Sequence, residues 1–235
     1  MFFTSQTMNV SATVNVLRLF ANPSLCLPHH TIATFDHLPI PLSAAFASSE
    51  KGHTRPDIRA VLIDKDNCFA VPKSNVVHPP YQSRFDELRK AYPGSRLLIV
   101  SNSAGTNSDP GGREADVLER NTGVKVLRHS TKKPGCHAEV MNYFRSAPDA
   151  GVTEPSQVAV VGDRLLTDVM LANMMGSHAI WVKTGTVEDN GLVSMAGDQV
   201  NDAAKRWQFT RFERGLHGFL TRRGYIPQQP RSDFE

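Results

Sequence analysis

The stretch Val61-Leu62-Ile63-Asp64-Lys65-Asp66-Asn67 decides the fold and the first hypothesis about chemistry. Three apolar residues lead into a carboxylate, and a second carboxylate follows two positions later. A continuous apolar run is typical of a buried strand in a parallel sheet. Ligands of open α/β sheets bind beyond the carboxyl ends of such strands. We therefore expect Asp64 and Asp66 to lie where chemistry is done.

Two carboxylates this close repel each other, and one is pushed towards protonation unless a cation compensates the charge. With a cation present, one of them can act as a nucleophile while the other exchanges protons. A solvated Asp-Lys-Asp turn is the more common explanation of this pattern taken alone. The rest of the chain has to decide between the two.

Size and composition indicate a globular protein. The 235 residues are enough for one ample domain with extensions, and the hydrophobic content of 40% and charged content of 21% are ordinary. A net charge of +3 is too small to indicate nucleic acid, so no such partner is expected. The three cysteines form no C-x-x-C pair or disulfide framework, which is typical of a reducing compartment. Without a run of about 18 apolar residues, no membrane-spanning helix is expected.

The chain divides into three parts. Residues 1–57 are predicted to form an amphipathic helix that ends before Pro23, followed by an extended proline-rich linker, either free or draped on the domain. Residues 58–185 form the core, and residues 186–235 form a helical extension. The helix within residues 1–22 carries no acidic residue. It fits a mitochondrial presequence, a helix lying on a membrane surface or a helix packed on its own domain.

The core alternates between strand and helix patterns. Strands are predicted at 60–63, 97–100, 124–127, 158–161 and 179–182, and helices at 81–91, 113–122, 135–145 and 165–174. This alternation predicts a Rossmann-like α/β fold. Its sheet is mostly parallel, with five strands or more and helices on both faces.

A last helix is predicted over residues 199–223, either continuous or broken near Gly215 or Gly218. Four apolar residues recur in it at spacings of three and four, and four arginines share the segment. These are Phe209, Phe212, Leu216 and Phe219, with Arg211, Arg214, Arg222 and Arg223. The favoured interpretation is that its aromatic face packs on the sheet. The alternative is a basic amphipathic surface for anionic lipid.

Four of the predicted strands end in side chains that suit phosphoryl chemistry. Asp64 and Asp66 follow the first, Ser101 and Asn102 the second, Arg128 to Lys133 the third, and Gly162-Asp163 with Asp168 the fourth. Hydroxyl and backbone N–H groups bind phosphate oxygens, and a lysine neutralises charge. Asp163 can reach a divalent cation together with Asp64. Each feature alone has an ordinary explanation, but their joint order at strand ends is specific.

The order D-K-D-N, S-N, K-K-P and G-D-x4-D resembles the four motifs of the haloacid-dehalogenase (HAD) superfamily of phosphatases, over residues 58–185. A closer resemblance, which runs through the N-terminal segment, is to the mitochondrial phosphatidylglycerophosphatases of that superfamily, of a subfamily IIIA-like type. It rests on residues 15–19, 22–26, 38–41, 101–105 and 126–136. The resemblance implies hydrolysis of phosphatidylglycerophosphate on the way to cardiolipin. It also implies peripheral association with the matrix side of the inner mitochondrial membrane, and a homo-oligomer is compatible with it.

The resemblance implies the following catalytic roles. Asp64 attacks the phosphorus and forms an aspartyl-phosphate. Asp66 protonates the leaving alkoxide and then takes a proton from water. Mg²⁺ is the expected cofactor, held by Asp64, by the backbone carbonyl of Asp66 and by Asp163.

Further residues are expected around the phosphate by the same resemblance. Ser101 and Asn102 would donate hydrogen bonds to phosphoryl oxygens. Lys133, with Lys132 as the alternative, would balance the charge of the phosphate and of the nucleophile. Asp168 would orient this lysine or a metal-bound water.

Many relatives carry a cap domain, and the spacing here leaves no room for one. One loop and one helix fit between Asp66 and Ser101, and one helix and one strand fit between Ser103 and Lys133. An open site predicts a substrate that is large or presented from a surface, such as a lipid head group, a nucleic-acid end or a phosphoprotein. Arg128 and His129 either contact the second phosphate of the head group or are surface residues at a strand end.

Two other classes of function remain open from the sequence. One is an uncapped phosphatase that acts on another phosphomonoester. The other is an inactive membrane adaptor that kept the fold. The presence of every expected catalytic residue type argues against the adaptor.

Overall fold

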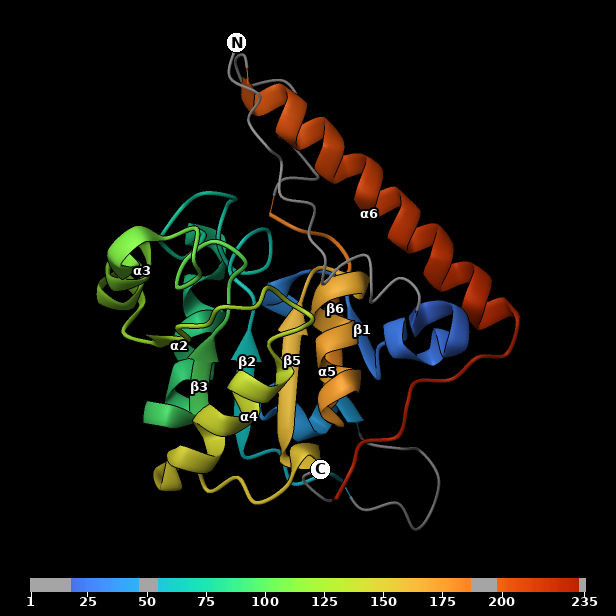
Figure 1. Cartoon of the computed structure of the whole chain (residues 1–235), viewed down its shortest axis with the longest axis horizontal. Helices are drawn as coiled ribbons and strands as arrows, with labels where there is room; N and C mark the ends of the chain where they lie inside the picture. The colour runs from blue at the N-terminus through green and yellow to red at the C-terminus, as the bar shows by residue number, and fades with distance from the viewer. Residues whose placement is uncertain (1–17, 47–54, 187–197, 233–235) are drawn as a thin grey trace.

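A computed structural model describes the backbone of residues 18–46, 55–186 and 198–232, and the side chains of the last range from residue 208 onward (Figure 1). The predicted N-terminal helix lies almost entirely outside the described residues. Only its last turn, residues 18–21, is described, and that turn is helical as predicted.

The centre of the fold is a parallel sheet with the strand order β1-β6-β5-β2-β3-β4. Its six strands are β1 (His30–Ile32), β2 (Ala60–Ile63), β3 (Leu97–Ile99), β4 (Lys125–Val126), β5 (Val158–Gly162) and β6 (His178–Val182). Every neighbouring pair is parallel. The predicted Rossmann-like α/β class is confirmed, with one strand more than the five identified in the sequence.

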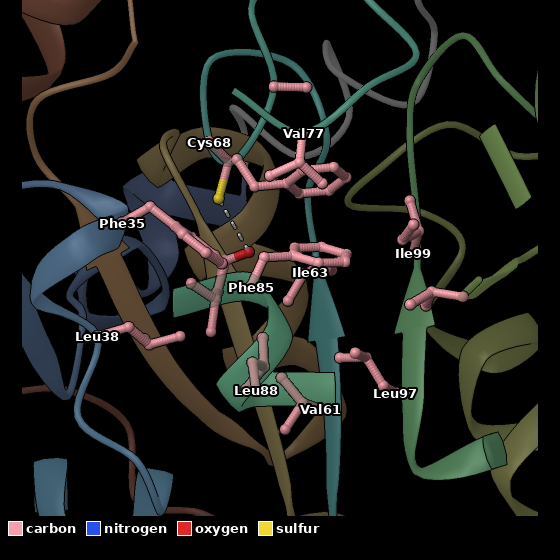
Figure 2. Packing of buried hydrophobic residues seen from close by; sticks show 14 of the residues in the cluster. Phe35, Leu38, Val61, Ile63, Cys68, Val77, Phe85, Leu88, Leu97 and Ile99 are labelled. Carbon is pink, nitrogen blue, oxygen red and sulfur yellow. Dashed lines mark hydrogen bonds between the residues drawn. The ribbon is translucent and has the colours of Figure 1, made fainter. Parts of the chain in front are cut away.

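Alternate residues of the strands enter two separate cores, one on each face of the sheet. Val61 and Ile63 belong to the first core, whereas Ala60 and Leu62 belong to the second. The helices α2 (Gln82–Ala91) and α3 (Arg113–Thr122) cover the first face, and α4 (His137–Ser146) and α5 (Met170–Met175) cover the second. Figure 2 shows the first core, where Val61, Ile63, Leu97 and Ile99 of the sheet lie near Phe85 and Leu88 of α2. Burial on both faces explains why the strands read as continuous apolar runs.

The strand order reverses its direction beside β2. The chain runs outward from β2 to β3 and β4, then crosses back to β5 on the other side of β2. The loops after β2 and β5 therefore leave the sheet in opposite directions. Such a switch point is where open α/β sheets bind ligands.

Much of the segment predicted as a proline-rich linker belongs to the domain, and that prediction is wrong for residues 23–46. β1 lies in this segment and pairs with β6 at the edge of the sheet. Phe35, Leu38 and Leu42 are at most 1% exposed and complete the first core. The prolines do exclude long helices, but the apolar residues between them bury enough surface to fix the segment.

The last helix, α6 (Asp198–Arg222), is continuous through both glycines considered as break points. Of the face predicted to pack on the sheet, Leu216 does pack against the second core, but the favoured interpretation is wrong for the three phenylalanines. Phe209, Phe212 and Phe219 are 52%, 58% and 48% exposed. Glu213 and Leu220 are buried instead, and the Leu166 backbone N–H donates a 3.2 Å hydrogen bond to Glu213 Oε1. In the described residues, no helix is both long enough and apolar enough to cross a membrane.

We predict that Glu213→Gln raises the free energy of unfolding only at high pH. Burial is the main cause that raises the pKa of Glu213 from 4.5 to about 7, Asp168 adds to the shift and Arg164 opposes it. Because the folded-state pKa is raised, ionised Glu213 destabilises the fold; this cost is absent below pH 4.5, grows up to pH 7 and is complete above it. Glutamine keeps an acceptor for the Leu166 N–H and carries no charge. The variant should gain on the order of 2 kcal/mol above neutral pH.

Urea denaturation across the pH range measures this gain. The exposed Glu87 of α2 supplies the matched control, because Glu87→Gln makes the same chemical change without relieving a buried charge. An increase in unfolding free energy for Glu213→Gln that is the same at acidic and at alkaline pH would contradict the raised pKa of Glu213.

Candidate active site

A buried lysine at the carboxyl edge of the sheet holds two aspartates together. Lys133 Nζ donates a hydrogen bond to Asp64 Oδ1 and a second one, 2.7 Å long, to Asp168 Oδ1. Lys133 is 3% exposed, Asp64 8% and Asp168 1%. These residues come from the ends of three different segments, after β2, after β4 and after β5. The predicted association of the strand-end motifs is therefore seen in the structure.

The charges of this cluster do not balance. Burial raises the pKa of Asp64 well above its ordinary value; the charge of Lys133 opposes this shift, and the charges of Asp168 and Asp163 add to it. Burial alone would lower the pKa of Lys133, but Asp168 and Asp64 more than offset this effect and raise it. One ammonium group thus faces three carboxylates, and the cluster is short of positive charge.

The cluster fits a divalent cation. Carboxylate oxygens of Asp64, Asp163 and Asp168 all lie within 4.8 Å of one another. Asp163 Oδ2 accepts a 2.8 Å hydrogen bond from Asn67 Nδ2, whereas the buried Asp163 Oδ1 has no hydrogen-bond partner among the described residues. Burial, with the charge of Asp168, raises the pKa of Asp163 to about 7. Converging carboxylate oxygens, one of them unpaired, are the donor set that Mg²⁺ takes in proteins.

Asp168 is the member of the three that is already fully engaged. Its Oδ1 accepts from Lys133, and its Oδ2 accepts a 3.1 Å hydrogen bond from the Arg164 backbone N–H. It follows β5 within a π-helical turn, Leu165–Val169, that leads into α5. Asp168 therefore positions Lys133, which is one of the two roles expected for it, and Asp64 and Asp163 keep the free capacity for a cation.

The second strand-end pair approaches the cluster through the loop that carries Lys133. Asn102 Oδ1 accepts a 2.7 Å hydrogen bond from the Lys133 backbone N–H, and so fixes the start of that loop. Ser101 is buried, and its hydroxyl lies 3.1 Å from the hydroxyl of Ser103. The Asn102 carbonyl oxygen is thus used inside the protein, while its amide NH₂ keeps donor capacity.

Three further candidates lie apart from the carboxylate cluster. Lys132 is exposed, and Lys133 is the lysine that enters the cluster. Arg128 forms ion pairs of 2.6 Å with Asp116 and 3.1 Å with Glu119 on α3. His129 is buried, and its two ring nitrogens lie 2.7 and 2.9 Å from the backbone oxygens of Thr131 and Ser101. In this structure neither Arg128 nor His129 is directed at the cluster, and His129 supports the Ser101 loop.

The comparisons with known proteins agree with this geometry. The sequence model of the family described as mitochondrial PGP phosphatase matches residues 10–187. The mitochondrial phosphatidylglycerophosphatase GEP4 of Saccharomyces cerevisiae is 48% identical over 214 residues, which cover 91% of this chain and 99% of that protein. The probable mitochondrial phosphatidylglycerophosphatase of Schizosaccharomyces pombe is 32% identical, over 76% of this chain and 84% of that protein.

The chain belongs to the mitochondrial PGP phosphatase family. The chain is a phosphatase enzyme, as the sequence predicted. Between Asp66 and Ser101 the only α-helix is α2, and between Ser103 and Lys133 the only one is α3, in a stretch described without gaps. No cap domain is therefore inserted between Asp66 and Lys133.

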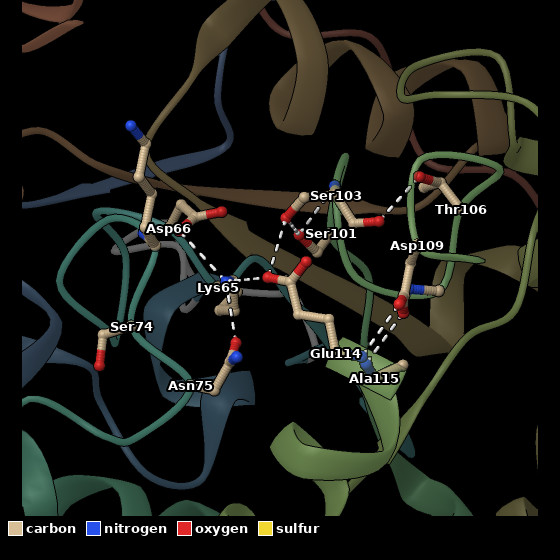
Figure 3. A network of polar contacts seen from close by, with 12 residues as sticks. Lys65, Asp66, Ser74, Asn75, Ser101, Ser103, Thr106, Asp109, Glu114 and Ala115 are labelled. Carbon is tan, nitrogen blue, oxygen red and sulfur yellow. Dashed lines mark hydrogen bonds and ion pairs between the residues drawn. The ribbon is translucent and has the colours of Figure 1, made fainter. Parts of the chain in front are cut away.

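A second buried lysine, which the sequence reasoning passed over, supports Asp66 in this phosphatase. Lys65 is 0% exposed, and its Nζ lies 3.0 Å from Glu114 Oε1, 3.2 Å from Asn75 Oδ1 and 3.4 Å from Asp66 Oδ1 (Figure 3). The same Glu114 oxygen accepts a 3.4 Å hydrogen bond from the Ser103 hydroxyl. The network therefore ties the Asp66 loop to α3 and to the loop after β3. The available signal was the position of Lys65 between Asp64 and Asp66, directly after a buried strand.

We predict that Gly162→Ala inactivates the PGP phosphatase without unfolding it. A Cβ atom at this position would overlap the carboxylate of Asp168, so Asp168 has to move and Lys133 loses its second partner. A displacement of about 1 Å at a catalytic group can cost roughly a hundredfold in rate. Phosphate release measures the loss. Gly215→Ala is the matched control because nothing lies within 4 Å of the added carbon, and it should keep full activity.

We predict that Lys65→Met lowers both stability and turnover, and that a second substitution separates the two effects. Removing the ammonium leaves Glu114 and Asp66 without their cation, which should cost on the order of 2 kcal/mol in unfolding free energy. Adding Glu114→Gln removes the unpaired charge on α3, so stability should partly return. Turnover should stay low, because Asp66 still lacks Lys65. Recovery of both quantities in the double variant would show that Lys65 has a structural role only.

Proposed function

We propose that this phosphatase hydrolyses phosphatidylglycerophosphate to phosphatidylglycerol and phosphate in mitochondria, as a step towards cardiolipin. The observation that carries the chemistry is the buried Lys133 that joins Asp64 to Asp168 beside the unpaired oxygen of Asp163. The substrate follows from the relatives, whose names specify phosphatidylglycerophosphatase activity. The matrix side of the inner membrane is the proposed location.

In the proposed reaction Asp64 attacks the phosphorus and the oxygen–phosphorus bond to the glycerol breaks, which leaves an aspartyl-phosphate. Asp66 gives its proton to the departing alkoxide. It then takes a proton from the water that attacks the aspartyl-phosphate, so that phosphate leaves and Asp64 is restored. The contacts of Asp66 with Lys65 and with the Lys73 N–H, 2.7 Å from Asp66 Oδ1, hold its carboxylate in place.

Lys133 and the loops around it serve the charge of the reacting group. Lys133 opposes the rise in the pKa of Asp64 and orients its carboxylate, and Asp168 keeps Lys133 in place. Ser101 and the Asn102 amide are the proposed donors to phosphoryl oxygens. Mg²⁺ held by Asp64, Asp163 and the Asp66 carbonyl would supply the missing positive charge for phosphoryl transfer.

The open site favours a head group presented from a surface over a small metabolite. Without a cap, the protein cannot enclose a small phosphomonoester and exclude water by itself. A lipid head group arrives anchored in the bilayer, which supplies part of the enclosure. Peripheral membrane association is therefore part of the proposal.

We predict that Asp64→Asn abolishes release of phosphate from phosphatidylglycerophosphate in micelles while the protein stays folded. The amide is a poor nucleophile of nearly the same size. Adding EDTA to the unmodified protein should have the same effect, and Mg²⁺ should restore activity. Turnover by Asp64→Asn at the unmodified rate would contradict the mechanism.

The adjacent lysines give a sharper comparison in the same assay. Lys133→Met removes the buried partner of Asp64, whereas Lys132→Met changes only an exposed side chain. The first should be inactive and the second active. The proposed substrate is tested by comparison with phosphatidic acid, a 3′-phosphorylated oligonucleotide and an aryl phosphate. Equal rates on all of them would be consistent with the proposed reaction but would contradict phosphatidylglycerophosphate as the specific substrate.

A further inference from the structure

The part of α6 beyond residue 208 turns an apolar surface away from the domain. Phe212 and Phe219 are 58% and 48% exposed and stand two turns apart, so they lie on the same side of the helix. Phe209, one turn before Phe212, is 52% exposed, but the Arg164 guanidinium of the domain lies over its ring, 5.3 Å from the centre, so it is not part of this surface. The domain is held by the adjacent side of the helix, which carries the buried Glu213 and Leu220, about 100° around the helix axis from Phe212 and Phe219. Large exposed apolar side chains gathered on one element mark an interaction site.

This surface stands beside the active site. Three contacts fix it to the segments that follow β5 and β6. The Leu166 N–H donates to Glu213 Oε1 at 3.2 Å, Arg214 Nη2 donates to the Lys183 backbone oxygen at 2.9 Å, and the Trp181 and His217 rings are 5.1 Å apart. Lys183 follows β6 directly, and Leu166 lies two residues before Asp168. α6 is thus anchored at the carboxyl edge, where the aspartate cluster lies (Figure 1).

Positive charge surrounds the aromatic side chains. Arg222 and Arg223 are exposed near the end of the helix, and Arg211 is exposed next to Phe212. The Arg223 guanidinium lies over the Phe219 ring, 5.2 Å from its centre. Glu213 is the one acidic residue between 208 and 223, and it is buried. Phenylalanines flanked by arginines are typical of a helix that lies in the interface of an anionic bilayer.

We propose that this face, formed by Phe212, Phe219, Arg222 and Arg223, docks the phosphatase onto an anionic lipid surface. The inference rests on the proposed function, since a lipid head group is the reason to bring the carboxyl edge to a membrane. Aromatic side chains enter the boundary between head groups and acyl chains, and the arginines bind lipid phosphates. Because Glu213 and Arg214 hold the helix at the site, docking presents the open edge of the sheet to the head groups.

Cosedimentation with vesicles that contain no substrate tests the surface directly. Vesicles of phosphatidylcholine with phosphatidylglycerol should bind the unmodified protein more tightly than vesicles of phosphatidylcholine alone. The double variant Phe212→Ser/Phe219→Ser should lower the partition coefficient about tenfold or more, and Arg222→Glu should lower it about tenfold. Phe212→Trp/Phe219→Trp should keep the binding, because tryptophan favours the interface.

Matched controls separate docking from folding and from chemistry. Lys90→Glu makes the same charge change at an exposed position of α2, on the other face of the sheet, and should leave vesicle binding unchanged. Each α6 variant should hydrolyse a soluble aryl phosphate at the unmodified rate, whereas hydrolysis of vesicle-borne lipid should fall in parallel with binding.

Two results would overturn the docking surface. One is equal vesicle binding by the Phe212→Ser/Phe219→Ser variant. The other is a change in the oligomeric mass of that variant, measured by light scattering, without a change in vesicle binding. That result would show that the face contacts a second copy of the chain. Because these vesicles hold no substrate, failure of phosphatidylglycerophosphate hydrolysis would leave the binding result intact. If hydrolysis in micelles is normal and the α6 variants bind vesicles as well as the unmodified protein does, the docking proposal is refuted and the proposed function stands.

Discussion

The buried hydrogen bonds from Lys133 to Asp64 and Asp168 are the constraint on which the rest of the site depends. Charges removed from water are costly unless each has a partner, and a pair that loses one member leaves an uncompensated charge. The surroundings reduce this cost in specific ways. The Arg164 N–H binds Asp168, Asn67 binds Asp163, and Asn102 holds the Lys133 backbone. Polar groups from four loops thus converge on the cluster, because its buried charges need hydrogen-bond partners.

The sheet can collect these groups because its strand order reverses beside β2. Asp64 and Asp163 end neighbouring strands, β2 and β5, although nearly one hundred residues separate them in the sequence. The register pairs Ile63 with Val161, so Asp64 emerges level with Gly162 and Asp163 follows one residue beyond. Two apolar cores fix that register, since slipping by one residue would exchange the two faces of every strand. Packing far from the site therefore sets the geometry of the carboxylates.

Patterns confined to one segment could be predicted from the sequence, whereas features set by distant contacts could not. The strand ends that carry Asp64, Ser101 and Asp163 follow apolar runs, and that signal is local. Phe35 and Leu38 lie between prolines, and no local pattern marks them as core residues. They are buried because they pack on the first face of the sheet. The exposed side of α6 was misjudged because its aromatic spacing fits a packed face equally well, and Glu213, a residue type that is seldom buried, takes the inner side. The sequence left Lys132 as an alternative to Lys133. The structure distinguishes the two, because Lys133 is buried and Lys132 is exposed.

The distribution of charge explains why the phosphatase needs positive groups in two places. Lys133 is engaged by two carboxylates, so it cannot by itself also neutralise a phosphomonoester that brings further negative charge. Asp163 adds a third carboxylate, and without a cation the centre would repel an anionic substrate. The outer positive charge lies instead on α6, where Arg222 and Arg223 are exposed. The arginines of α6 attract an anionic surface. The carboxylate cluster carries excess negative charge, which a divalent cation has to offset before a phosphoryl group can bind.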